Sequence, residues 1–252
     1  MDQQTFNLLM LAWIALAILL MPVQLFVTAP YGRHASRRWG PVIGNRLGWV
    51  IMEIVSPVAL LAAFLWGGIP DTGVIWVCVA LWIAHYMHRA IVFPLRIRTS
   101  GKHIPVAIVL SAVAFNSING WANGFYLGSG WGGYPPGWGS DPRFIIGIAV
   151  FLAGAAINLW ADGELIALRK HRESHYTIPH GGLFEKVSCP NHLGEIIEWC
   201  GFAIACWNLP ALAFAVWTAA NLIPRALSHH RWYAREFPDY PANRKALVPY
   251  VL

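Results

Sequence analysis

Long apolar stretches, separated by short polar connections, recur along the whole chain. A helix crosses the hydrocarbon core of a bilayer with about 20 mostly apolar residues, because it rises about 1.5 Å per residue. Seven such stretches predict an all-α integral membrane protein with seven transmembrane helices. The first is not typical of a signal peptide, since Asp2 stands where a basic residue is expected, and it should bend near Pro22. The predicted helices cover Thr5 to Val27, Trp49 to Trp66, Gly73 to Phe93, Ile104 to Leu127, Phe144 to Ala161, His192 to Trp207 and Pro210 to Ala226.

The distribution of Lys and Arg predicts the orientation of these helices. If the seven helices cross in turn, all of the 18 basic residues except Arg143 fall on one side of the membrane. Cytosolic loops carry the excess of Lys and Arg, so this side is predicted to be cytosolic, with the N-terminus outside and the C-terminus in the cytosol. The cytosolic set comprises Arg33, Arg37, Arg38, Arg46, Arg89, Arg96, Arg98, Lys102, Arg169, Lys170, Arg172, Lys186, Arg225, Arg231, Arg235, Arg244 and Lys245.

Composition narrows the class of protein further. Of the 252 residues, 57% are hydrophobic and 12% are charged, whereas a soluble domain carries about 25% charged residues. The apolar content excludes a disordered chain. The cytosolic loops explain the formal charge of +6 better than a nucleic-acid partner does. The four cysteines form no CxxC pair, so no metal site is expected, and residues 1–252 are predicted to form a single membrane domain.

Polar residues within the predicted helices share one depth. Glu53 lies roughly 6 to 10 Å inside the second helix from its cytosolic end, and Tyr86 lies roughly 10 Å from the cytosolic end of the third. Ionisable groups within a membrane are expensive and indicate a functional interior. The polar residues at this depth predict a polar region that is open to the cytosol. Such a region could bind a water-soluble cofactor that enters from the cytosol and an apolar substrate that enters from the bilayer. Its other members are Asn158, Asp162, Asn191, Glu195, Glu198, Arg225, His229 and His230.

Each of these features also has a purely structural interpretation. The carboxyl of Glu53 could bond a neighbouring helix in its neutral form, and an isolated tyrosine is more often a core residue than a catalytic one. The amides of Asn116, Asn119 and Asn123 are typical of bonds between helices. The run Gly128 to Gly133 fits GxGxxG but is interpreted as a plain loop, because a dinucleotide-binding fingerprint requires a preceding strand and this run follows a spanning helix.

Several stretches of the chain resemble the steroid 5α-reductase family, the 3-oxo-5α-steroid 4-dehydrogenases, and its type 2 members in particular. Together they are specific, and the similarity extends over nearly the whole chain. The stretches are His85-Tyr86-Met87-His88-Arg89, Tyr176-Thr177-Ile178-Pro179-His180-Gly181-Gly182-Leu183-Phe184, Asn191-His192-Leu193-Gly194-Glu195-Ile196-Ile197-Glu198-Trp199, Leu209-Pro210-Ala211-Leu212-Ala213-Phe214-Ala215, and Asp239-Tyr240-Pro241 with Arg244-Lys245-Ala246-Leu247-Val248-Pro249.

This resemblance implies a membrane enzyme that uses NADPH to reduce the Δ4 double bond of 3-oxo-Δ4-steroids to 5α-reduced 3-oxosteroids. It implies that Glu53 and Tyr86 hold the substrate ketone. Residues 1–127 would mainly bind substrate, and residues 144–252 would mainly bind NADPH. The cofactor-binding residues that the resemblance implies are Asn158, Asp162, Arg169, Tyr176, Asn191, Glu195, His229 and Tyr233, together with Arg33.

The chemistry of an enone gives these two residues distinct roles. Hydride addition to the β carbon moves negative charge to the ketone oxygen, so the catalyst must stabilise an enolate. The phenol of Tyr86 is a hydrogen-bond donor at physiological pH, and a preorganised donor of this kind is worth roughly 2.7–4 kcal/mol. Burial among apolar neighbours is expected to raise the pKa of Glu53, so that it acts as a protonated second donor; an ionised Glu53 would repel the enolate and would orient Tyr86 instead.

Two other classes of protein share parts of this pattern. An S-adenosylmethionine-dependent methyltransferase of the isoprenylcysteine or phospholipid type has a similar pattern around Asn191 to Trp199, although four complete preceding helices favour the reductase. A receptor or transporter fits less well, because the polar groups gather at one end of the helices. The expected partners are a steroid or another hydrophobic enone and membrane lipid, and the oligomeric state is not predicted. A bacterial inner membrane is favoured over the endoplasmic reticulum, since no glycosylation sequon or retention signal is evident.

Overall fold

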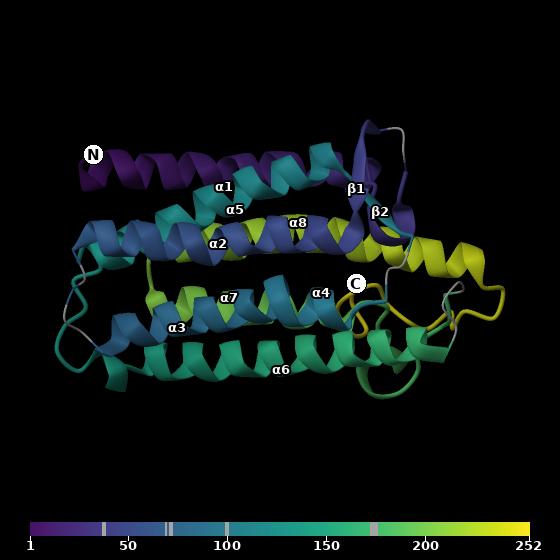
Figure 1. Ribbon diagram of the computed structural model, residues 1–252. Helices are drawn as coiled ribbons and strands as arrows, with labels where there is room; N and C mark the ends of the chain where they lie inside the picture. The colour runs from purple at the N-terminus through teal and green to yellow at the C-terminus, as the bar shows by residue number, and fades with distance from the viewer. Residues whose placement is uncertain (37–38, 69, 71–72, 99–100, 172–175) are drawn as a thin grey trace. The chain divides into compact units, whose positions relative to one another are not determined.

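The computed structural model describes residues 1–36, 39–68, 70, 73–98, 101–171 and 176–252, and in these ranges the chain is mostly helical (Figure 1). Arg37, Arg38 and Arg172, which the sequence analysis places on the cytosolic side, lie outside the described residues. The elements are α1 (Gln3–Phe26), β1 (Val42–Gly44), α2 (Asn45–Gly67), α3 (Gly73–Met87), a π-helical turn (His88–Val92), α4 (Phe93–Arg96), β2 (His103–Pro105), α5 (Val106–Gly128), α6 (Pro142–His171), α7 (Pro190–Cys206) and α8 (Leu209–Glu236), with short 3₁₀ turns at Gly32–His34, Trp138–Ser140 and Gly182–Glu185.

A helix is present at each of the seven predicted positions. By length and apolarity, six of the helical segments in the described part of the chain qualify as membrane spans. The helix α7, at the sixth predicted position, has 17 residues and is shorter than these candidates. The candidate spans are Gln3–Phe26, Asn45–Gly67, Gly73–Arg96, Val106–Gly128, Pro142–Arg169 and Leu209–Glu236.

Two helices continue well past the apolar stretches that predict them. The prediction for α6 ends at Ala161 and that for α8 at Ala226, whereas the helices end at His171 and Glu236. The length of an apolar stretch reflects the thickness of the bilayer, and a helix can continue beyond that stretch. The segment after Ala161 is rich in Leu, Ala, Glu, Arg and Lys, which are strong helix formers, so the helix continues as its side chains become polar.

The strands β1 and β2 form a short antiparallel pair, which the sequence pattern does not predict. Ile43 pairs with Ile104 at the centre of the register. Figure 1 shows that β1 leads directly into α2 and β2 into α5. The fully buried Ile104 packs with Met52 and Val109, so the strand pair fixes the starts of both helices. Strands of three residues are too short to give an alternating pattern that can be recognised in the sequence.

The chain divides into two compact units. The first comprises Met1–Phe6, Ala29–Ile145 and Asn208–Ala211, and the second comprises Asn7–Thr28, Ile146–Trp207 and Leu212–Leu252. Glu53 and Tyr86 therefore belong to the first unit, together with Arg33. The other residues that the resemblance assigns to the cofactor belong to the second unit.

In the first unit, α2 and α5 pack with their backbones in close contact (Figure 1). Gly120, Gly124 and Gly128 lie along one face of α5 at a spacing of four residues. A Cβ atom added at Gly124 would overlap the carbonyl group of Leu60, and one added at Gly128 would overlap that of Phe64. Small residues at this spacing let membrane helices approach closely. This packing fixes the register of the two helices that carry Glu53 and Asn116.

In the second unit, glycines bring α6 and α7 equally close. A Cβ atom at Gly154 of α6 would overlap the backbone nitrogen of Glu198, and one at Gly194 of α7 would lie 2.5 Å from the backbone nitrogen of Asn158. Real Cβ atoms essentially never come that near, so glycine is required at both places. The close approach places Asn158 beside the first turns of α7.

Candidate functional site

A chain of hydrogen bonds connects Tyr86 with α2 in the first unit. The Tyr86 hydroxyl on α3 donates to Oδ1 of Asn116 on α5 at 3.3 Å, and Nδ2 of Asn116 donates to the backbone carbonyl of Met52 at 2.7 Å. Tyr86 is 3% exposed and Asn116 is 5% exposed. Met52 immediately precedes Glu53, which is half-buried. The three helices are thus joined by polar groups at the level of the two residues expected to hold the ketone.

The phenol ring of Tyr86 is held by aromatic neighbours. The ring of Trp82, one turn earlier on α3, stacks on it with 5.4 Å between ring centroids, and His85 contacts it edge-on at 5.1 Å. The indole nitrogen of Trp82 donates to the hydroxyl of Ser56 on α2 at 3.1 Å, which fixes Trp82 in turn. These contacts limit rotation of the Tyr86 ring.

A π-helical turn, His88–Val92, begins two residues after Tyr86, where α3 ends at Met87. Such turns insert an extra residue into a helix and often occur at functional sites. The turn changes the phase of the helix after Tyr86, and Arg89 within it lies over the rings of Trp49 and Phe93 at 5.3 and 4.9 Å. The turn is not predictable from the apolar pattern, because a π turn leaves that pattern unbroken.

Four polar residues predicted to bind cofactor form one network in the second unit. Nδ2 of Asn158 on α6 lies 2.9 Å from the carbonyl oxygen of Asn191 and 3.4 Å from a carboxylate oxygen of Glu195, both on α7. Nδ2 of Asn191 donates to the carboxylate of Asp162 at 3.0 Å. Asn158 and Asp162 are buried, and Asn191 and Glu195 are half-buried. The network therefore extends from the interior of the unit to its accessible side.

Other predicted cofactor residues lie along a row of aromatic side chains in the same unit. The guanidinium of Arg169 at the end of α6 lies 5.6 Å from the ring centroid of Tyr176. Trp232 contacts the rings of both Tyr176 and Tyr233, at 5.0 and 5.3 Å. Tyr233 stacks on Tyr240 with an angle of 7° between the rings.

His229 on α8 is connected to the polar network through α7. Its ring lies 5.5 Å from that of His192, which is adjacent to Asn191 in the chain. Both histidines are almost fully buried. The structure thus brings eight of the predicted cofactor residues into one unit. The ninth, Arg33, is half-buried in the turn Gly32–His34 of the first unit.

Residues of the C-terminal tail, to which the sequence analysis gave no role, hold the second unit together. The hydroxyl of Ser188 lies 2.7 Å from Nδ1 of His230 and 2.6 Å from the hydroxyl of Tyr240. Arg244 is 1% exposed, donates to the carbonyl of Pro179 at 3.0 Å and lies 3.7 Å from the carboxylate of Glu185. The tail stretch that resembles the family was the signal that could have identified these residues.

Two of the tail contacts perturb titratable groups. Burial raises the pKa of the Tyr240 phenol, although its bond to Ser188 acts in the opposite direction. The pKa of Glu185 is lowered, chiefly because its carboxylate accepts a hydrogen bond from the backbone nitrogen of Gly181, and secondarily by the charge of Arg244. Both groups therefore keep their usual protonation states at neutral pH.

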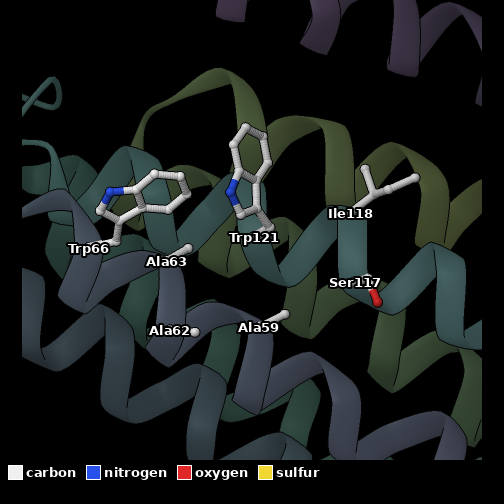
Figure 2. A pocket seen from close by; sticks show the side chains of 7 residues that line it. All are labelled: Ala59, Ala62, Ala63, Trp66, Ser117, Ile118 and Trp121. Atoms are coloured by element: carbon white, nitrogen blue, oxygen red, sulfur yellow. The ribbon is translucent and has the colours of Figure 1, made fainter. Parts of the chain in front are cut away.

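A groove of about 510 Å³ lies on α2 and α5 of the first unit (Figure 2). Figure 2 shows the indole rings of Trp66 and Trp121 rising beside the alanines of α2. At 100° per residue, Ala59 and Trp66 lie roughly 120 to 140° around α2 from Glu53. The groove is thus on another side of the helix and is separate from the Tyr86 site. It is lined by Ala59, Ala62, Ala63, Trp66, Ser117, Ile118 and Trp121.

Comparison with known proteins gives consistent matches. Residues 102–252 match a family model described as 3-oxo-5-alpha-steroid 4-dehydrogenase. The chain is 39% identical over 242 residues to 3-oxo-5-alpha-steroid 4-dehydrogenase 1 of Bos taurus. The aligned region covers 94% of this chain and 93% of that protein. It is 36% identical over 258 residues to steroid 5-alpha-reductase DET2 of Solanum lycopersicum, covering 99% of this chain and 98% of that protein.

The corresponding human protein, also named 3-oxo-5-alpha-steroid 4-dehydrogenase 1, is 38% identical over 223 residues, covering 88% of this chain and 85% of that protein. These matches give no support to the methyltransferase alternative. Because the mammalian relatives named here carry the number 1, the closer resemblance to type 2 enzymes stays a prediction. The relatives named here come from animals and a plant, so they do not support the preference for a bacterial membrane.

Proposed function

Because this chain belongs to the 3-oxo-5-alpha-steroid 4-dehydrogenase family, we propose that it reduces the Δ4 double bond of 3-oxo-Δ4-steroids to give 5α-reduced 3-oxosteroids. It is an oxidoreductase, and the proposed hydride donor is NADPH. The observation that carries the proposal is the buried Tyr86 hydroxyl, hydrogen-bonded through Asn116 to the backbone beside Glu53 in an apolar helical unit. A hydroxyl in that environment is the donor that reduction of an enone requires.

The chemistry assigns one task to each of these groups. NADPH, when bound, supplies the hydride that the β carbon of the enone accepts. The electron pair of the double bond then moves toward the ketone, and Tyr86 stabilises the enolate oxygen by donating its hydroxyl hydrogen. Removing one preorganised donor of this kind costs roughly 2.7–4 kcal/mol of transition-state stabilisation. Neutral Glu53 provides a second donor to the same oxygen, and the α carbon takes a proton from Tyr86 or water.

The network on α6 and α7 has the groups that a dinucleotide needs. Amide and carboxylate groups of Asn158, Asn191 and Glu195 match ribose hydroxyls and the nicotinamide amide, and Asp162 orients Asn191. Arg169 provides positive charge for phosphate, and its planar guanidinium suits the additional 2′-phosphate of NADPH. We assign Tyr176, His229 and Tyr233 to the lining of the same cofactor, and the role of Arg33 in cofactor binding rests on the family resemblance alone.

The same proposal includes a multi-pass topology in which α7, the sixth in chain order, crosses the membrane in addition to the six candidate spans. The N-terminus lies outside and the C-terminus in the cytosol, as the positive-inside rule predicts. Large apolar side chains on α1 support contact with lipid, since Leu19 is 71% exposed and Phe26 is 88% exposed. The lone basic residue on the outer side, Arg143, is neutralised by Asp141, to which it makes two side-chain hydrogen bonds of 2.9 and 2.8 Å.

Mass spectrometry of the reaction product tests this function. Purified protein in nanodiscs is incubated with NADPH and a panel of enone lipids that includes Δ4-3-ketosteroids. The expected product has gained one hydride and one proton, and it matches the 5α standard rather than the 5β standard. Parallel incubation with S-adenosylmethionine covers the alternative chemistry. A methylated product, without any reduced product in the NADPH sample, would contradict the proposal.

A further inference from the structure

The orientation of the Asn116 amide is determined by its surroundings. The backbone carbonyl of Met52 can only accept a hydrogen bond, so the amide nitrogen of Asn116 must face it, at 2.7 Å. The amide oxygen then faces the hydroxyl of Tyr86, at 3.3 Å. The amide oxygen carries no hydrogen and can only accept a hydrogen bond, so the Tyr86 hydroxyl is the donor in this contact.

Asn116 therefore connects three helices through two bonds. Tyr86 comes from α3, the Met52 carbonyl from α2, and Asn116 itself from α5. The close packing of α5 on α2, set by glycines such as Gly120, keeps Asn116 at this level of α2. Because both partners of Asn116 lie in the first unit, the arrangement does not depend on the other unit.

We propose that Asn116 is a positioning residue that holds the Tyr86 phenol for catalysis, an inference that rests on the proposed function. A phenol has a single hydrogen to donate. Before the steroid binds, Asn116 accepts that hydrogen and keeps the hydroxyl next to the Glu53 segment of α2. When the ketone arrives, the hydroxyl hydrogen turns to the ketone oxygen, and the ring stays in the place that Asn116 and Trp82 define.

A double-mutant cycle tests this proposal. Asn116→Leu removes both bonds while keeping the branching of the side chain, and Tyr86→Phe removes the group on which Asn116 is proposed to act. In the parent background, Asn116→Leu is expected to lower kcat roughly tenfold, the size of one hydrogen bond. In the Tyr86→Phe background, it is expected to lower the residual kcat less than twofold. NADPH affinity, measured by tryptophan fluorescence, is expected to stay unchanged in all four proteins.

Asn123→Leu is the matched control on the same helix. Asn123 is 1% exposed, and its amide nitrogen lies 3.0 and 3.3 Å from the backbone carbonyls of Asn119 and Pro210. It has no bond to Tyr86. The control should lower the melting temperature about as much as Asn116→Leu while leaving kcat within twofold of the parent. If Asn116→Leu does not purify as a folded protein, Asn116→Ala takes its place in the cycle with the same expectations.

The outcomes separate this inference from the function on which it rests. Equal effects of the Asn116 substitution in both backgrounds, or an unchanged kcat in the parent background, would overturn the positioning role. If Tyr86→Phe alone keeps the parent kcat, the assignment of Tyr86 as the donor fails, and the role of Asn116 fails with it. Loss of Tyr86→Phe turnover with an unaffected Asn116→Leu leaves the function standing and rejects the inference alone.

Discussion

The side chain of Asn158 on α6 donates a hydrogen bond to the backbone carbonyl of Asn191, in the first turn of α7. Glycines at positions 154 and 194 bring the two backbones close enough for this bond, so the helix pair and the polar network form together. The bond places the Asn191 amide against Asp162 and leaves Glu195 at the edge of the network. Packing of small residues thus produces the polar surface that we assign to the cofactor.

Asn158→Leu tests that assignment. The substitution keeps the number and branching of the side-chain heavy atoms but removes the donor to Asn191 and Glu195, so NADPH binding is expected to weaken roughly tenfold, equivalent to about one hydrogen bond. The KM for steroid should change much less. Titration of tryptophan fluorescence with NADPH gives the first quantity and steady-state kinetics the second. Asn208→Leu, in the first unit, is the control, and an equal loss for both variants would reject the assignment.

Glu53→Gln distinguishes a neutral carboxyl from an ionised one. A neutral Glu53 acts as a hydrogen-bond donor, and the Gln amide can also donate, so kcat should remain within roughly tenfold of the parent. Glu53→Leu lacks any donor and should lose roughly 100-fold or more. Comparing kcat of Glu53→Gln with kcat of Glu53→Leu at saturating NADPH tests whether Glu53 acts as a neutral donor. If Gln is as poor as Leu, the reaction requires the carboxyl itself and the neutral-donor account is wrong.

The sequence predicts much of this arrangement because membrane helices leave strong signals. Apolar length predicts seven helices, and the structure has a helix at each of those positions. The shared depth of polar residues predicts that Glu53 and Tyr86 act at one level of the membrane. Contacts that depend on partners distant in the chain were not predictable in the same way. The asparagines on α5 suggested bonds between helices, and Asn116 and Asn123 do reach other helices. Only the structure identifies Tyr86 as one of those partners.

Other features carry no pattern that a single sequence reveals. The three-residue strands at Ile43 and Ile104 are too short for alternation, and the π turn at His88 preserves apolarity. The buried guanidinium of Arg244 was counted among the cytosolic charges, because a charge census does not distinguish exposed residues from buried ones. The glycine repeat on α5 has the spacing of a close-packed helix face, and that signal could have been used.

Gly124→Ala tests the close packing of α2 and α5. The new methyl group would overlap the Leu60 carbonyl, so the helices must separate, and the free energy of unfolding should fall by about 1–3 kcal/mol. Gly73→Ala is the control, since a Cβ at Gly73 meets no atom within 4 Å and its φ is not positive. Thermal unfolding in nanodiscs measures both. A melting temperature for Gly124→Ala equal to that of the control would contradict this packing.

The ion pair before α6 predicts a pH-dependent contribution to stability. Hydrogen bonds from Arg143 lower the pKa of Asp141 from 3.8 to about 2. Because the pKa is lower in the folded state than in the unfolded state, the ionised carboxylate stabilises the fold at any pH above the unfolded pKa. This stabilisation is lost as the pH falls from about 4 to about 2. The parent should therefore be more stable than Asp141→Asn at pH 7, and the difference should shrink below pH 4. A difference that stays constant down to pH 2 would contradict the pairing.

In the proposed reaction, hydride passes from NADPH to the β carbon of an enone whose ketone is held by Tyr86. The most direct measurement uses NADPH carrying deuterium at the transferred position of the nicotinamide, with a Δ4-3-ketosteroid and the purified protein. NMR and mass spectrometry should find one deuterium at the β carbon of the parent's product. Tyr86→Phe should place the label at the same carbon at a kcat roughly 100-fold or more lower. An unlabelled product, or a Tyr86→Phe variant that turns over like the parent, would contradict the account.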